Sequence, residues 1–210
     1  MARHLVCLTF DFDALSSWIW RGETTPTQIS RGEFGVVGAE RILALLNRYG
    51  IQATWFVPGH TIDTYPEICQ RIYAAGHEIG HHGYLHEPPA TLGSRAEEEV
   101  VLVQGNEAIR RLTGAPARGY RSPSWDLSQH TVDLLLAHGF SYDSSMMAHD
   151  DQPYRVRRGD VITADRPIQW GESTRLIELP VSWSLDDYPH FEYRRTENVL
   201  QEGLRRAGDV

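Results

Sequence analysis

The sequence predicts an α/β fold built around a largely parallel sheet. Short apolar runs alternate along the chain with segments of helical periodicity, and this alternation is typical of parallel sheets flanked by helices. Polar residues also gather directly after the predicted strands, where the active sites of α/β proteins lie. A closed barrel and an open sheet would both satisfy these two observations.

The predicted strands are apolar runs bounded by turn residues. The first ends in acidic residues and the second stops at Pro58-Gly59. In chain order, strands are predicted at residues 5–10, 51–57, 77–80, 119–121, 140–142 and 176–181.

The predicted helices have recognisable ends. Pro66 stands where a first helical residue is favoured, Ser128 can cap a helix start, and glycines at 50, 76, 114 and 139 act as C-terminal stops. In chain order, helices are predicted at residues 39–46, 66–75, 95–113, 128–138 and 196–206. No closing strand follows the last helix, so we expect a C-terminal part of the fold to be missing from this chain.

Size and charge narrow the class of protein. The 210 residues suit one large domain or two small ones, and we expect a single domain over positions 1–210. The net charge of −8, without a basic patch, argues against a nucleic-acid partner. No apolar run reaches the ~18 residues that span a bilayer, and no export signal opens the chain. Cys7 and Cys69 are expected to be small buried hydrophobes. We therefore expect a cytoplasmic protein without a membrane partner.

Histidines and aspartates form the first candidate site. His82 and His86, in HEIGHHGYLH, are spaced i, i+4, and a helical turn would place both rings on one face. Asp11 and Asp13, in TFDFD, would point to one face of a strand end. The alternative is that these are ordinary polar residues, with one Asp capping a turn. His81 is expected to point away from the site.

One Asp and two His together would form a catalytic site for a divalent metal ion, with Zn²⁺ the ion expected. The second Asp would then be free to act as general base. Arg121 could orient that Asp through a charge-assisted hydrogen bond, or be an ordinary surface residue. Trp125 follows it on a predicted loop and is a candidate for substrate binding. Other tryptophans, Trp55 and Trp183 among them, are expected in the core or a pocket wall.

Three motifs in order, TFDFDA, GHEIGHHGYLH and RSPSW, resemble those of the polysaccharide deacetylase family, also called carbohydrate esterase family 4. The resemblance covers positions from about 5 to 190. It implies a distorted (β/α) barrel of about seven strands. It also implies Asp11 as general base, Asp13, His82 and His86 as metal ligands, and Arg121 as the residue that positions Asp11.

The sequence departs from the usual family pattern in several places. Phe12 separates the two aspartates, and Gly83 replaces a Ser or Thr. The segments DSSMM and ELPVSWSLDDYPHF resemble those of one branch of the family, which contains peptidoglycan deacetylase-like proteins and is similar to cyclic-imide hydrolases and allantoinases. This resemblance implies that the protein forms a homo-oligomer such as a tetramer. The Leu-x-His motif that supplies a general acid is not found. His190 is a candidate substrate-binding residue, and the roles of Asp143, Asp186 and Asp187 are left open.

Three functions follow as hypotheses. The first is a metal-dependent N-deacetylase of acetylated amino sugars, such as those of peptidoglycan. The second is a hydrolase of a small cyclic amide, such as an imide or allantoin, which the expected cytoplasmic location favours. The third is a non-catalytic module that binds a carbohydrate or metabolite on a degenerate hydrolase scaffold.

Overall fold

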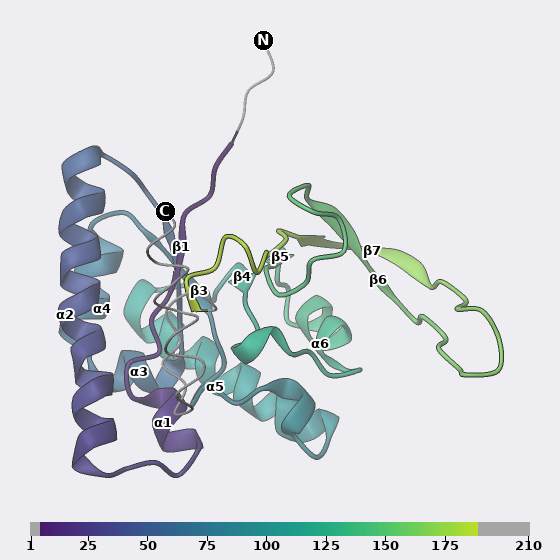
Figure 1. Ribbon diagram of the computed structural model, residues 1–210, viewed down its shortest axis with the longest axis horizontal. Helices are drawn as coiled ribbons and strands as arrows, with labels where there is room; N and C mark the ends of the chain where they lie inside the picture. Colours follow the sequence, from purple (N-terminus) through teal and green to yellow (C-terminus); the bar gives the residue numbers. More distant parts are fainter. Residues whose placement is uncertain (1–4, 189–210) are drawn as a thin grey trace, which may run out of the picture.

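The computed structural model describes residues 5–188, and these residues form one seven-stranded sheet with helices packed against it (Figure 1). The strand order is β1-β2-β3-β4-β5-β7-β6. All neighbouring strands run parallel except β6 and β7, which form an antiparallel hairpin. The strands are β1 (Thr9–Asp11), β2 (Thr54–Val57), β3 (Glu78–His81), β4 (Gly119–Tyr120), β5 (Tyr142–Asp143), β6 (Tyr154–Arg158) and β7 (Glu172–Glu178).

Helices connect the parallel strands. The longest, α2, stands along one side of the molecule, and α5 crosses below the sheet in Figure 1. Gly50 takes a φ of +63° and ends α2 as predicted. The helices are α1 (Ser16–Trp20), α2 (Pro26–Tyr49), α3 (Gly59–Thr64), α4 (Pro66–Ala74), α5 (Arg95–Thr113) and α6 (Thr131–Ala137), with 3-10 turns η1 (Pro89–Thr91) and η2 (Pro123–Trp125).

The α/β class and the seven strands are confirmed. Strands β1 and β6 lie at the two edges of the sheet, and within residues 5–188 these edges do not pair with each other. The sequence did not predict β6, because its residues YRVRR are mostly polar and exposed. It also placed the start of β7 four residues late, at the first apolar residue, since the hairpin arm around Glu172–Arg175 projects away from the core.

The prediction of a buried strand from residue 5 is wrong. Strand β1 begins at Thr9, and Leu5 and Val6 are 78% and 84% exposed. The neighbouring strand β2 starts at Thr54, whose N–H donates to the carbonyl of Leu8. Within the described part of the chain, residues 5–7 therefore have no strand beside them. Cys7 is therefore exposed rather than buried, whereas Cys69 is buried as predicted.

Boundaries also shift near the other elements. Helix α6 begins at Thr131 rather than Ser128, because the Ser128 hydroxyl accepts the N–H of His130 in the turn before the helix. The short helices α1 and α3 were not predicted. The predicted helix at 196–206 lies outside the described residues. Among the described helices, none combines the length and apolar character that crossing a bilayer requires.

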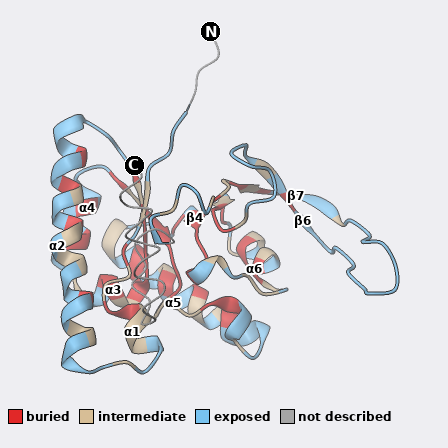
Figure 2. Ribbon diagram, viewed as in Figure 1, coloured by how far each residue is buried: buried red, intermediate tan, exposed pale blue. Residues whose placement is uncertain are grey.

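The core lies between the sheet and the helices and is one continuous cluster (Figure 2). Trp55 of β2 is buried at its centre, as predicted. The outer face of α2 and the β6–β7 arm are exposed. The parallel strands end at a common edge, so loops that are distant in sequence meet there. Helix α5 supports this edge closely: a Cβ atom on Gly105 would lie 2.3 Å from His81 Nε2.

Two helical glycines should respond oppositely to substitution by alanine. Gly105→Ala should lower the free energy of unfolding by ~1–3 kcal/mol, since the added methyl overlaps His81. Gly38→Ala should raise it by ~0.5–1 kcal/mol, because that site in α2 has open space and alanine favours helix. Urea unfolding measures both values. An equal change of the same sign would contradict the close packing of α5 on β3.

Candidate functional site

Asp11 ends β1, Asp13 follows two residues later, and both carboxylates face His82, as their spacing predicted. Phe12 between them points into the core, where it is 4% exposed and meets Trp55 edge-on. The Thr61 hydroxyl donates to the Asp13 carbonyl at 2.7 Å and fixes the turn that follows the strand. Phe12 thus anchors the strand end while its two neighbours project toward the loops at the edge of the sheet.

His82 and His86 follow β3, but the predicted helical turn is wrong. The segment is a loop in which Gly83 and His86 have positive φ values of 73° and 63°. The Glu87 carboxylate accepts the N–H groups of Tyr84 and Leu85, which closes the loop on itself. The two rings still meet, with centroids 4.9 Å apart and planes nearly perpendicular.

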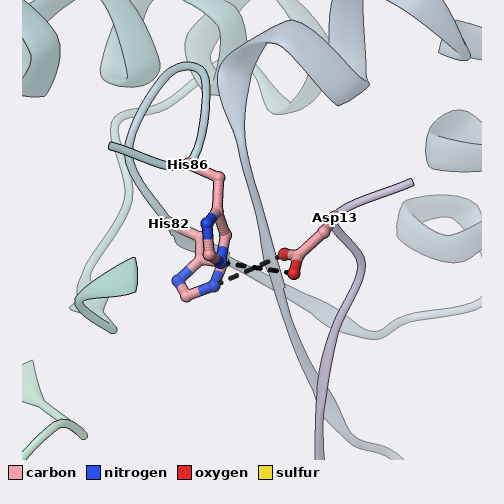
Figure 3. A group of neighbouring side chains, drawn as sticks. All are labelled: Asp13, His82 and His86. Carbon is pink, nitrogen blue, oxygen red and sulfur yellow. Dashed lines mark ion pairs between the residues drawn. The ribbon is translucent and has the colours of Figure 1, made fainter. Parts of the chain in front are cut away.

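The two imidazoles face the Asp13 carboxylate across the edge of the sheet (Figure 3). His82 Nε2 lies 3.4 Å from Asp13 Oδ1, and His86 Nε2 lies 3.3 Å from Asp13 Oδ2. One ligand atom of each residue lies within 4.8 Å of the others. Atoms that bind one zinc ion at about 2 Å stand roughly 3 to 3.5 Å apart in tetrahedral geometry, so the spacing fits a shared ion.

Electrostatics also fit a cation at this position. Asp13 Oδ1 is buried and has no hydrogen-bond partner among the described residues. Burial raises the pKa of Asp13 to about 6, because the charged carboxylate loses its hydration, and the charge of Asp11 adds to this effect. A buried carboxylate with one orphaned oxygen, facing two imidazole nitrogens, is the arrangement that a divalent ion resolves.

Hydrogen bonding orients His82 for such an ion. Its Nδ1 lies 2.7 Å from the carbonyl oxygen of Arg121, which can only accept, so the ring proton is on Nδ1. Nε2 then carries a free lone pair directed at Asp13. Burial lowers the pKa of His82, which favours the neutral ring that metal binding requires.

His81 points away from this group, as predicted. It is fully buried, with Nε2 3.0 Å from the Leu102 carbonyl and Nδ1 accepting the N–H of Gly83. Burial lowers its pKa to about 3, so it stays neutral. His81 therefore secures the loop and takes no part in the ligand set.

Arg121 is an inward-facing residue rather than a surface one. It is 7% exposed, and its Nη1 donates to Asp11 Oδ1 at 2.8 Å. Nε and Nη2 donate to the carbonyl and the hydroxyl of Ser144, and the guanidinium lies over the Phe56 ring. Asp11 keeps 32% of its side chain exposed, with Oδ2 3.8 Å from His82 Nε2. The structure thus brings Asp11 and Arg121 to the same edge as the three candidate ligands.

The remaining sequence candidates have mixed outcomes. Trp125 is half-buried and packs on Trp183 with ring centroids 4.6 Å apart. Trp183 is 54% exposed, so its expected place in the core or a pocket wall is only a partial match. Burial raises the pKa of Asp186; the charge of Asp11 also raises it, and that of Arg121 lowers it. His190 lies outside the described residues.

Sequence reasoning missed the supporting residues. Ser144, Glu87 and Glu178 hold the loops of the site, but none lies in a spacing that marks a role. Asp143, whose role the sequence left open, is fully buried beside Glu178. Of these residues, Asp143 directly follows the predicted strand at 140–142, and this position was the one sign that could have marked it.

Comparison with protein families identifies relatives of the chain. The sequence profile of the family described as polysaccharide deacetylase matches residues 2–142. A peptidoglycan deacetylase of Helicobacter pylori is 44% identical over 198 residues, which cover 88% of this chain and 67% of the relative. A peptidoglycan deacetylase-like protein of Gibberella zeae is 31% identical, over 90% of this chain and 60% of its own length. The chain thus spans about two thirds or less of these relatives.

Solved structures share the fold. A Mycobacterium smegmatis protein assigned to the polysaccharide deacetylases superposes with a TM-score of 0.74 at 33% identity, covering 97% of this chain and 70% of the other. An allantoinase superposes with a TM-score of 0.69 at 20% identity, with the same two coverages. At that lower identity the likeness concerns the fold alone.

The candidate ligands predict a specific metal response. Adding Zn²⁺ or Co²⁺ to metal-free protein should raise the Tm, because an ion that binds only the folded state stabilises it. His86→Ala should abolish this increase, since it removes one of three ligands. His149→Ala, at an exposed histidine, is the matched control and should respond like the wild type. An unchanged increase in the His86 variant would exclude this ligand set.

Proposed function

The chain belongs to the polysaccharide deacetylase family, and from this premise we propose that it is a metal-dependent hydrolase that removes N-acetyl groups from amino sugars. One observation carries the proposal: a partly exposed carboxylate, Asp11, is held by Arg121 beside three convergent candidate metal ligands. Hydrolysis of an amide needs a base for water and a stabilised oxyanion, and this arrangement supplies both.

Asp13, His82 and His86 would hold the ion in the proposed mechanism, and Zn²⁺ suits their nitrogen and oxygen donors. When bound there, a divalent ion supplies polarisation of the amide carbonyl and a lowered pKa of water. Asp11 Oδ2 accepts the proton of the attacking water, and Arg121 fixes the other oxygen of the same carboxylate. The protonated Asp11 can return that proton to the amine nitrogen as the C–N bond breaks, which yields acetate and a free amine.

Peptidoglycan is the first substrate class to test, because two curated relatives carry peptidoglycan deacetylase in their names. The paired rings of Trp125 and Trp183 offer an aromatic surface on the loops of the same sheet edge, and such surfaces suit the apolar faces of sugars. A small cyclic amide is the alternative substrate, and a non-catalytic binding module is the alternative of another class.

We further propose that the catalytic unit is a single domain, supported by one sheet and one hydrophobic cluster through the described residues. The homo-oligomer and the cytoplasmic location stay predictions. Light scattering on the purified protein and localisation of the tagged full-length protein test them.

Asp11→Asn should lower kcat for release of acetate from N-acetylated glycan fragments by at least ~100-fold, because the amide cannot accept the proton of water. Zinc content, measured by elemental analysis, should stay near that of the wild type, since Asp11 is not among the three candidate ligands. His82→Ala should lose both zinc and activity.

Parallel assays with N-acetylglucosamine oligomers, peptidoglycan fragments, a cyclic imide and allantoin separate the alternatives. Ring opening without acetate release would favour the cyclic-amide hydrolase. Saturable binding of glycan without hydrolysis by the zinc-loaded protein would favour the binding module. Full activity in Asp11→Asn would remove the proposed mechanism.

A further inference from the structure

Two buried carboxyl groups lie behind the site and outside the proposed chemistry. Asp143 and Glu178 are paired residues of the parallel strands β5 and β7, and neither side chain is exposed. One oxygen of each is satisfied: Asp143 Oδ1 accepts the Ser145 hydroxyl, and Glu178 Oε1 accepts the N–H groups of Ser145 and Met146. Each carboxyl therefore has one oxygen fixed by the same short turn.

The other two oxygens lack a donor. Asp143 Oδ2 and Glu178 Oε2 are buried, and no donor group of the described residues reaches them. The two side chains are within hydrogen-bonding reach of each other. Two ionised carboxylates in this position would repel each other without hydration, whereas a single proton between them satisfies both oxygens. Burial and the neighbouring Asp143 charge raise the pKa of Glu178 to about 9, in accord with a retained proton.

The turn at residues 143–146, which this carboxyl pair holds, also binds the side chain of Arg121. Ser144 accepts the Nε and Nη2 protons of Arg121 through its carbonyl and its hydroxyl. The Ser145 hydroxyl, which donates to Asp143, also accepts the N–H of Ser122 at 2.8 Å. Arg121 in turn donates to Asp11. Hydrogen bonds and the peptide link between Ser144 and Ser145 thus join the carboxyl pair to the proposed general base.

We propose that Asp143 and Glu178 are positioning residues that share one proton and, through the turn at residues 143–146, hold Arg121 in place against Asp11. The catalytic part of this inference rests on the proposed hydrolase activity. Loss of the shared proton would leave two facing carboxylates, push β5 from β7 and loosen the turn. Arg121 would then no longer fix the orientation of Asp11.

The tyrosines around the carboxyl pair do not lose their protons in the pH range in which the pair does. Tyr120 of β4 and Tyr154 of β6 face it, and burial raises the pKa of both phenols above the ordinary value of 10. The guanidinium of Arg121 faces the turn that the pair holds. Near pH 9, the carboxyl pair is therefore the group at this position whose protonation changes in the folded protein.

Glu178→Gln and Glu178→Leu form a matched pair of variants. The glutamine oxygen can accept from the turn while its amide N–H donates to Asp143, as the shared proton does. Leucine removes both functions at similar volume. We expect Glu178→Leu to lose at least ~10-fold in kcat with little change in KM, and Glu178→Gln to recover most of it. Above about pH 9 the activity of the wild type should fall more steeply than that of Glu178→Gln.

Two measurements without substrate keep this test separate from the proposed function. A carboxyl whose pKa is raised on folding stabilises the protein below its unfolded pKa and loses that stabilisation as pH rises through the folded pKa. The Tm of the wild type should therefore fall relative to that of Glu178→Gln between about pH 5 and pH 9. The Nε–H signal of Arg121 in the NMR spectrum should be protected in both proteins at pH 7 and lost in Glu178→Leu.

Each outcome decides the inference. If the Tm of the wild type and that of Glu178→Gln change in parallel with pH, the two carboxyl groups do not share a proton, whatever the enzyme assay shows. A protected Arg121 signal in a folded Glu178→Leu protein would overturn the positioning role. If no amide substrate is hydrolysed, the proposed function fails, while the Tm and NMR results still support or reject the carboxyl pair on their own.

Discussion

The crowding of Asp11 and Asp13 at the end of the first strand is the constraint on which the site depends. Two carboxylates on one side of a strand end repel each other, and each needs positive charge nearby. Arg121 provides it for Asp11 through a 2.8 Å hydrogen bond. Asp13 instead faces two neutral imidazoles and keeps one buried oxygen without a donor. This difference makes Asp13 the candidate ligand of a cation and leaves Asp11 available for the proposed proton transfer.

The loops that carry the site residues contain strained backbone conformations. Ala14, His86, Ser124 and Trp125 all have positive φ values between 47° and 63°, although none is glycine. They belong to the loops that follow β1, β3 and β4. Such conformations persist where the surrounding structure fixes them, and they concentrate at functional sites. Here the fixing contacts include the Glu87 carboxylate and the Thr61 hydroxyl.

Support for the site extends inward through hydrogen bonds rather than apolar packing alone. The carbonyl of Arg121 orients His82, its guanidinium orients Asp11, and Ser144 holds the guanidinium. Arg121 therefore links the candidate ligand set to the proposed general base. A long residue at the end of the short strand β4 can serve both because the strands on each side are parallel and end at the same level.

The sequence alone determined the α/β class, the family resemblance and the residues at the centre of the site, since the periodicity and the strand-end positions of Asp11, Asp13, His82 and Arg121 are local properties of the chain. It failed where the outcome depended on neighbours. Residues 5–7 have the apolar pattern of a strand but lie beyond the start of the adjacent strand β2, and His86 reaches Asp13 from a loop, not a helix. Only the tertiary structure paired Asp143 with Glu178, because register between distant strands is set by packing across the whole sheet.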